Sequence, residues 1–235
     1  MALGTIDTMV TRTVNGIAGD PINVGLVASR DDVLCAMHAA AWYLADPITP
    51  LTSARIVESI LRNEPYPNAP ISDLIYHGKR QDLAFEKPVG TSAERRHHVR
   101  FWRVFDRGEN GRSVWLGAAT FDQGIKRTGD SRRVTHEIAP DIDTERNLLT
   151  AHLTAAKVVE TIYEVTGIGS TDQGINGEGD VYHTDGNVKI SVLFEGCNQR
   201  AEAATISDAP PSVDIKNMDW DEVAKVILLA TAPKK

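Results

Sequence analysis

The sequence predicts a single α+β domain in which an antiparallel sheet meander, over about residues 71–138, packs with several helices. Its 235 residues, 42% hydrophobic and 24% charged, are enough to bury one substantial core. Apolar residues alternate with a period of two across the meander and recur every three or four residues on either side of it. Without a repeat or a composition shift, we expect residues 1–18 to be an N-terminal extension and residues 19–235 to form one domain.

The N-terminal part predicts one strand and two helices. Residues 22–29, INVGLVAS, alternate and are rich in branched side chains, which is typical of a strand, and the final serine is a suitable helix cap. Apolar residues at helical spacing then continue until Pro47 ends the first helix. Thr49 and Pro50 resemble a cap and a first helical position, so we expect the second helix to begin there and end near Arg62.

The middle of the chain predicts five strands and then a long helix. Turns that contain glycine separate strands expected near residues 71–77, 80–87, 96–105, 113–122 and 132–138. After Pro140, acidic residues precede an apolar stripe at helical spacing that reaches Tyr163. This stripe predicts a helix that packs against the core.

The C-terminal third is less regular. Residues 167–187 contain six glycines, which favours a flexible connection over a lid above a pocket. Asp185 and Gly186 separate two runs typical of strands and indicate a hairpin. The last residues predict a helix that packs on the domain.

Charge and cysteine usage narrow the class of protein. Asp and Glu number 32 against 25 Lys and Arg, a formal charge of −7 that opposes general attraction to nucleic acid. Cys35 and Cys197 alone imply neither a disulfide framework nor a cysteine zinc cluster, which fits a reducing compartment. Without a leader or an apolar run of 18 residues, we expect no transmembrane segment and a cytoplasmic location.

The common catalytic motifs are missing. The chain has no phosphate-binding loop motif, no nucleophile elbow and no zincin motif. His136 and Glu137 are followed closely by Pro140, which prevents a second histidine one helical turn later. We therefore expect no cofactor and no tightly held metal.

The meander brings charged residues to one face. If a turn centres near residue 91, Glu86 faces Arg96 and Asp82 faces Arg100; a turn near 109 then places Asp122 opposite Arg96. The opposite face is apolar and would pack on the core. The candidate ligand-binding residues are Arg80, Asp82, Glu86, Arg96, His98, Arg100, Asp122 and His136.

Three interpretations of this face stay open. It is a solvated surface with cross-strand ion pairs, each worth about 0.2–1 kcal/mol. Alternatively, small residues leave a concavity in which Arg96, Arg100 and His98 hold a phosphate or carboxylate. A third alternative is a metal site formed by His98, Asp122 and His136.

Several stretches together resemble the LssY C-terminal domain family. They cover most of residues 19–165: GDPINVGLVAS (19–29), WYLADPIT (42–49), RQDLAFEKPVG (80–90), RRHHVRFW (95–102), WLGAATFD (115–122) and VTHEIAPDIDTERN (134–147). The resemblance implies a module often appended to integral membrane proteins with a phosphatidic-acid-phosphatase-type or related domain. It therefore implies an association with phospholipid or polyprenyl-phosphate metabolism, and it carries over no catalytic mechanism.

We expect a non-catalytic, ligand-binding or regulatory module that recognises a phosphate-bearing small molecule, a lipid headgroup or a membrane-protein partner. The first alternative is a phosphate-ester hydrolase with His98 as general acid or base and Arg96 and Arg100 stabilising charge. In that enzyme Asp82 or Asp122 would orient the histidine. The second alternative is a purely structural protein-interaction domain.

Overall fold

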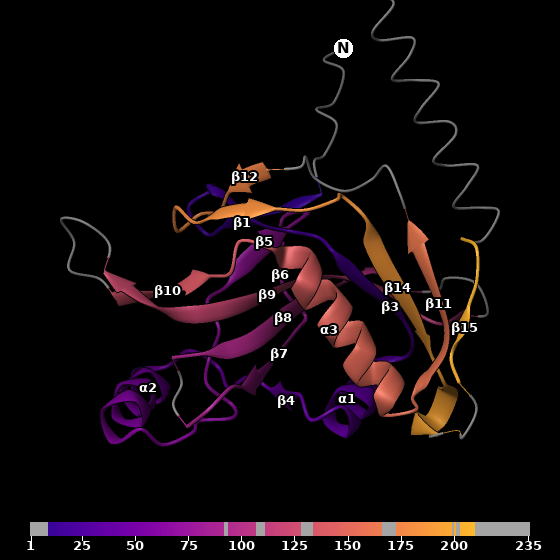
Figure 1. Cartoon of the computed structure of the whole chain (residues 1–235), viewed down its shortest axis with the longest axis horizontal. Coiled ribbons are helices and arrows are strands. Elements are labelled where there is room, and N and C mark those ends of the chain that lie inside the picture. The colour runs from indigo at the N-terminus through magenta and orange to yellow at the C-terminus, as the bar shows by residue number, and fades with distance from the viewer. Residues whose placement is uncertain are drawn as a thin grey trace, which may run out of the picture.

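A large mixed sheet dominates the computed structural model, which describes residues 9–91, 94–106, 111–127, 134–165, 173–198, 200 and 203–209 (Figure 1). The strand order is β15-β11-β14-β3-β9-β8-β7-β4, and β10 pairs with β9. The strands are β3 (Val24–Val27), β4 (Tyr43–Leu44), β7 (Leu83–Pro88), β8 (Arg96–Phe105), β9 (Val114–Arg127), β10 (Val134–Ile138), β11 (Val159–Val165), β14 (Val188–Leu193) and β15 (Thr205–Ile206).

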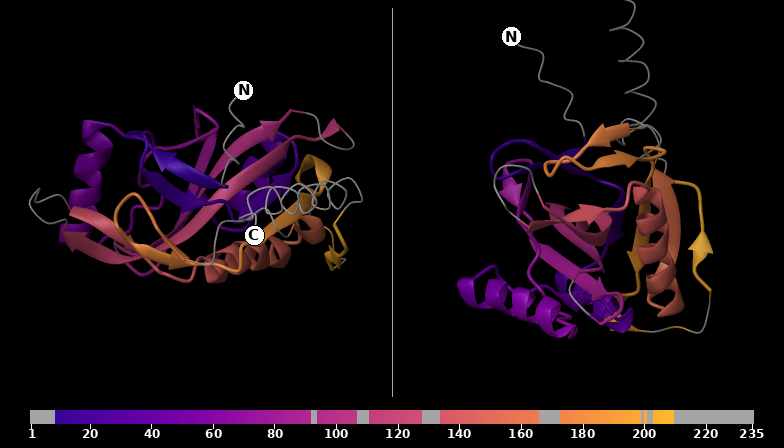
Figure 2. Two further views of the ribbon diagram at one scale, coloured as in Figure 1. Left: turned by 90° about the horizontal axis from the view of Figure 1, so that it is seen from above. Right: turned by 60° about the vertical axis from the view of Figure 1, so that its left-hand side comes forward.

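Smaller elements cover this sheet. Four strands form a second sheet in the order β2-β1-β5-β6, and β12 pairs with β13. Their bounds are β1 (Val10–Thr13), β2 (Ala18–Pro21), β5 (Leu74–Tyr76), β6 (Lys79–Arg80), β12 (Gln173–Ile175) and β13 (Val181–His183). The helices are α1 (Arg30–Ala39), α2 (Pro50–Arg62), α3 (Ile142–Ala155) and the short 3-10 helix η2 (Glu195–Cys197). Figure 2 shows that α2 lies apart from α3.

The predicted α+β class, a meander packed with several helices, is wrong, because the fold is mainly β. Within the described ranges only three α-helices accompany fifteen strands. The predicted long helix explains part of the error: α3 ends at Ala155, Lys157 adopts φ 59°, and the chain continues as strand β11. Its run of branched residues, VETIYEV, favours a strand although its spacing also fits a helix.

Other local predictions are confirmed. The side chain of Thr49 accepts a hydrogen bond from the backbone N–H of Thr52, Pro50 opens α2, and Asn63 ends it with φ 52°. Strands β7, β8, β9 and β10 pair in sequence as an antiparallel meander. Strands β5 and β6, however, leave the meander for the second sheet.

The meander contains two hairpins with a predicted register, and one of the two registers is correct. Arg96 pairs with Asp122, as expected from the turn after β8. In the preceding hairpin, Glu86 pairs with His98 and Arg96 with Pro88, so the predicted register is wrong by two residues. A slip of two keeps every side chain on its predicted face because strand side chains alternate with a period of two.

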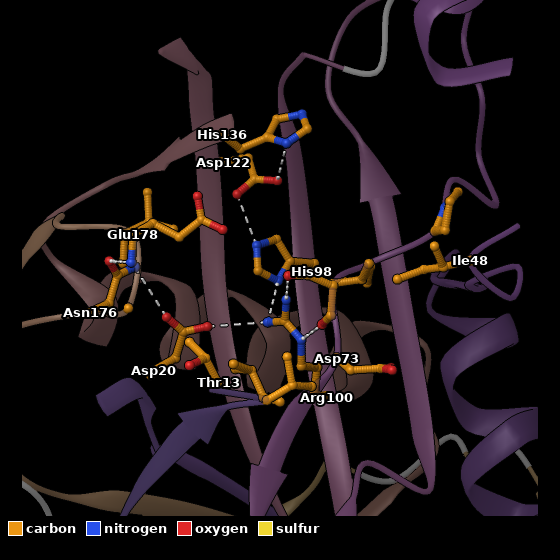
Figure 3. A pocket seen from close by; sticks show the side chains of 18 of the residues that line it. Thr13, Asp20, Ile48, Asp73, His98, Arg100, Asp122, His136, Asn176 and Glu178 are labelled. Carbon is orange, nitrogen blue, oxygen red and sulfur yellow. Dashed lines mark hydrogen bonds and ion pairs between the residues drawn. The ribbon is translucent and has the colours of Figure 1, made fainter. Parts of the chain in front are cut away.

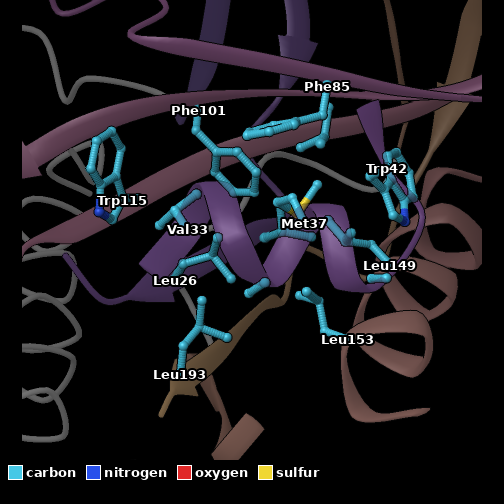
Figure 4. Close-up of a cluster of buried hydrophobic side chains, with 14 of the residues drawn as sticks. Leu26, Val33, Met37, Trp42, Phe85, Phe101, Trp115, Leu149, Leu153 and Leu193 are labelled. Atoms are coloured by element: carbon cyan, nitrogen blue, oxygen red, sulfur yellow. The ribbon is translucent and has the colours of Figure 1, made fainter. Parts of the chain in front are cut away.

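The two faces of β8 bury different cores. Val99 and Phe101 point toward α1 and α3 and pack with Met37, Trp42 and Leu149, the helix-side core shown in Figure 4. On the other face Trp102 packs under the second sheet with residues such as Leu74 and Tyr76. The charged side chains of β8 therefore share their face with this second core.

Several predictions about single segments need correction. Asp185 and Gly186 do not join a hairpin: β13 pairs with β12, β14 pairs with β11 and β3, and Arg146 holds Asp185 at 2.6 Å. Strand β1 lies among residues 1–18, the expected N-terminal extension, and pairs with β2 and β5, while the predicted domain bounds stay a prediction. Cys35 is disulfide-bonded, against the expectation from the cysteine count. The predicted C-terminal helix lies outside the described residues.

Candidate functional site

A cavity of about 970 Å³ opens on the charged face of the large sheet (Figure 3). Strands β8 and β9 supply its floor, and β2 and residues 176–180 supply one side. The opposite wall is apolar and comes from α2 and the residues before it: Ile48, Ile56, Val57 and Ile60. A charged floor thus meets an apolar wall in one space.

Alternation along β8 creates the floor. Arg96, His98 and Arg100 project from one face, while the residues between them belong to or border the opposite core. Each of the three is 3–5% exposed as a whole residue. Their partners on β9 include Ala118 and Thr120, whose small side chains leave room above the strand.

Arg96 is held by two acidic side chains. Its Nε donates to Asp122 Oδ2 at 2.9 Å, and its Nη1 donates to Glu86 Oε2 at 2.8 Å and to the carbonyl of Pro70 at 3.2 Å. Nη2, by contrast, makes no hydrogen bond to any residue that the structure describes. Arg96 lines the cavity, and its two Nη2 N–H groups have no acceptor in the described part of the chain.

His98 uses both ring nitrogens. Nε2 lies 2.9 Å from Asp122 Oδ1, and Nδ1 lies 3.3 Å from Nη1 of Arg100. A guanidinium can only donate, so Nδ1 must accept and Nε2 must carry the proton that Asp122 accepts. Thr120 Oγ1 lies 3.1 Å from Nε2 and 3.3 Å from Nδ1. This arrangement holds the ring and leaves neither nitrogen free to exchange a proton with a ligand.

Arg100 is fixed in the same way. Nη1 donates to Asp20 Oδ2 at 3.2 Å, Nε donates to the carbonyl of Ser72 at 2.9 Å, and Nη2 donates to Ser72 Oγ at 3.1 Å. Asn176 Nδ2 donates to the other oxygen of Asp20 at 3.4 Å. The floor is thereby linked to the side of the cavity formed by residues 176–180.

The pKa values of the two acids that bind Arg96 shift in opposite directions. Burial alone would raise the pKa of Asp122, but the hydrogen bond from His98 and the charge of Arg96 hold it below its ordinary value. Burial raises the pKa of Glu86 to about 8, although Arg96 and the backbone N–H of Ala69 partly offset it. Asp122 therefore carries the fixed negative charge at the centre of the floor.

Residues 176–180 form a fixed loop over the cavity. Asn176 Oδ1 accepts hydrogen bonds from the backbone N–H groups of Glu178 at 3.0 Å and Asp180 at 2.9 Å. Asp180 in turn binds Lys126 and the backbone of Ile138. Gly177 packs so closely on Thr13 that a larger side chain would collide with it. This part of the glycine-rich segment lines the cavity and is more than a connection.

The structure brings most of the predicted residues together. Arg96, His98, Arg100 and Asp122 form the floor, and His136 on β10 lies 3.9 Å from Asp122. Glu86 holds Arg96 from behind but does not line the cavity.

Two predicted residues lie at or beyond the margin. Arg80 reaches only the rim, with its side chain 68% exposed and paired with Asp73. Asp82 lies outside the site: it precedes β7 and accepts from the backbone of Arg103 at 2.8 Å. The two-residue slip between β7 and β8 removes Asp82 from Arg100, for which Ala84 is the partner.

Two interpretations of the face are corrected. The ion pairs are not solvated, because Arg96, His98 and Asp122 are almost fully buried. His98, Asp122 and His136 do meet, but within the described ranges no group of three or more His, Cys, Asp or Glu could hold a metal ion.

Sequence reasoning missed three residues of the site: Asp20, Asn176 and Glu178. Asp20 follows Gly19 in a short strand, and the other two belong to the turn NGEGD. The only signal in the sequence is an acidic residue beside glycine, which is common in ordinary turns.

No helix among the described residues is long and apolar enough to cross a membrane.

Comparison with known proteins found one family, described as LssY C-terminus, whose model matches residues 4–188. No curated protein and no solved structure matches the chain. Since the matched part is well over half of the sequence, the chain belongs to the LssY C-terminus family.

Proposed function

We propose that this domain binds an amphiphilic ligand without transforming it. The anionic group of the ligand, a phosphate in the simplest case, lies on the floor against Arg96 and Arg100. Its apolar part follows the wall made by α2. The observation that carries the proposal is the meeting of unused Arg96 donors and an apolar wall in one cavity.

The unused donors favour an anionic group. Arg96 Nη2 has two N–H groups without a partner in the described part of the chain, and Arg100 Nη2 uses only one of its two. A phosphate oxygen that accepts from these N–H groups would form charge-assisted hydrogen bonds. The arginines are already oriented by Asp122 and Asp20, so little side-chain entropy is lost on binding.

The apolar wall favours a hydrocarbon chain. Ile48 and Val57 line the cavity, yet they are 54% and 56% exposed. Covering apolar surface stabilises a complex by about 0.8 kcal/mol for each buried CH₂ group. A lipid or a polyprenyl phosphate combines such a chain with a phosphate. The family resemblance points to the same class of ligand.

The hydrolase alternative draws on the His98 and Asp122 pair, in which a carboxylate orients an imidazole. Against it, Arg100 occupies the second nitrogen of that ring. A hydrolase would release inorganic phosphate from short-chain phosphatidic acid, and we expect none. Binding to a membrane-protein partner and a purely structural role are the other two alternatives, and no contact in the cavity favours either of them.

The cytoplasmic location also stays a prediction, and one observation speaks against it. Disulfides persist mainly in oxidising compartments, and Cys35 is disulfide-bonded. The binding proposal itself is independent of the compartment.

Calorimetry with phosphatidic acids of increasing acyl length, each below its micelle concentration, tests the proposal. We expect affinity to rise roughly fourfold for each CH₂ that reaches the wall. Val57→Asp should remove this dependence on chain length. Leu61→Asp is the matched control, because Leu61 lies on the same helix, is 79% exposed and does not line the cavity. Equal affinity for every chain length and for inorganic phosphate would overturn the proposal.

A further inference from the structure

One acidic side chain of the cavity has no role in the network. Glu178 lines the cavity, and its carboxylate makes no hydrogen bond or ion pair with any residue in the described part of the chain. Figure 3 shows this side chain directed from its loop toward the space above His98. Because Asn176 and Asp180 fix the loop on both sides, this position is built into the fold.

The lining around Glu178 has a small excess of acidic residues. The carboxylates of the lining outnumber its arginines, and the acids are Asp20, Asp73, Asp122, Glu178 and Asp180. Partial burial of its carboxyl group raises the pKa of Glu178, Asp180 adds to the effect, and Lys126 offsets part of it. Lys126 is itself bound to Asp180. Lys126 and Arg100 therefore act on Glu178 electrostatically, but Glu178 forms no ion pair with either of them.

The same cavity also contains hydrogen-bond donors that lack an acceptor. Arg96 lines the cavity with a side chain that is 6% exposed, and its Nη2 makes no hydrogen bond to a residue that the structure describes. Glu178 is also close enough to Arg100 to raise its pKa, although burial lowers that pKa overall. Glu178, which has no ion pair among the described residues, and Arg96, whose Nη2 has no acceptor there, thus line one cavity.

We propose that the ligand carries an ammonium group next to its anionic group, and that Glu178 binds the ammonium. This inference rests on the proposed function and names the class of headgroup. A phosphate alone would add negative charge to an acidic lining, which like-charge repulsion opposes. A zwitterionic head such as phosphoethanolamine satisfies both ends, because an ammonium offers three donors to a carboxylate while the phosphate accepts from Arg96.

The inference is tested with four probes. Three are lipids with the same short chains, dihexanoyl phosphatidylethanolamine, phosphatidylcholine and phosphatidic acid, and the fourth is free phosphoethanolamine. For the wild-type chain we expect phosphatidylethanolamine to bind about tenfold more tightly than phosphatidic acid, the effect of one charge-assisted hydrogen bond. Phosphatidylcholine should bind more weakly than phosphatidylethanolamine, since its quaternary ammonium has no N–H to donate.

Glu178→Gln should abolish the tenfold preference and leave phosphatidic acid binding at least as tightly as before. Glu137→Gln is the matched control: it removes an exposed carboxylate from the neighbouring strand β10, outside the lining, and should keep the preference. Because Glu178 lies in a loop and is exposed, its substitution is expected to preserve the fold.

The outcomes separate the two proposals. If the lipids bind equally and Glu178→Gln changes nothing, the ammonium inference is wrong and the amphiphile proposal stands. If free phosphoethanolamine binds as tightly as its lipid and Glu178→Gln weakens the binding of both, the ammonium inference stands and the amphiphile proposal is wrong. If none of the four probes binds, both are wrong.

Discussion

Nη1 of Arg100 donates to Nδ1 of His98 at 3.3 Å, so a cation fixes the imidazole from one side while Asp122 fixes it from the other. The chain of contacts continues to Asp20 at one end and Arg96 at the other. Charges of both signs alternate along it, and every member is almost fully buried. The floor of the cavity is therefore a preorganised polar surface whose charges are mostly balanced internally.

The tautomer of His98 follows from this geometry. We expect Nε2 to carry a proton and Nδ1 to accept one, because Asp122 can only accept and Arg100 can only donate. Two-dimensional nitrogen–proton NMR of the imidazole distinguishes the forms. A proton on Nδ1, alone or together with one on Nε2, would show that the contact with Arg100 is not a hydrogen bond.

Removing one buried charge should cost far more than removing an exposed one. Arg96→Ala leaves Asp122 without its guanidinium, and such losses typically destabilise by about 3–5 kcal/mol. Arg80→Ala breaks an exposed pair with Asp73 and should cost less than about 1 kcal/mol. Chemical denaturation measures both. A similar loss for the two variants would mean that the network of Arg96 is not buried.

Stability should fall as pH rises across neutrality. Glu86, with a pKa of about 8 in the fold against an ordinary 4.5, holds a proton that the unfolded chain has lost. Its stabilising contribution is complete below pH 4.5 and disappears as pH rises through about 8. The lowered pKa of Asp122 acts in the opposite sense, but only as pH falls below its ordinary value of 3.8. Thermal unfolding between pH 5 and 9 should show the decline, and Glu86→Gln should flatten it. An unchanged slope in that variant would assign the decline to another group.

The thiol of Cys35 should be unreactive until a reductant is added, because it is disulfide-bonded in helix α1. Alkylation of the denatured, unreduced chain followed by peptide mass spectrometry measures this directly. Modification of Cys35 before reduction would contradict the disulfide and restore support for a reducing compartment.

Local sequence signals predicted an element correctly where the pattern fitted only one kind of secondary structure. Helix α2 begins after Thr49 with Pro50 and ends at Asn63, as the cap chemistry of these residues requires. The turn between β8 and β9 gave the correct pairing of Arg96 with Asp122. The segment after Ala155 failed, because its apolar spacing fits both a helix and a strand, and only pairing with β14 decides between them.

The candidate site was predictable only within the meander. Alternation places Arg96, His98 and Arg100 on one face whatever the exact register. The prediction that they share a face is therefore correct, although the predicted register was wrong by two residues. Asp20 and Glu178 come from segments far away in the sequence, and their approach depends on how the second sheet and the loop fold over the first. No local pattern contains that information.

A crystal structure of the chain with dihexanoyl phosphatidic acid tests the central claim most directly. We predict a phosphate oxygen within hydrogen-bond distance of Arg96 Nη2 and an acyl chain against Ile56 and Ile60. Lipid bound elsewhere on the surface, or a cavity that stays empty at saturating lipid, would contradict the assignment of this cavity as the binding site.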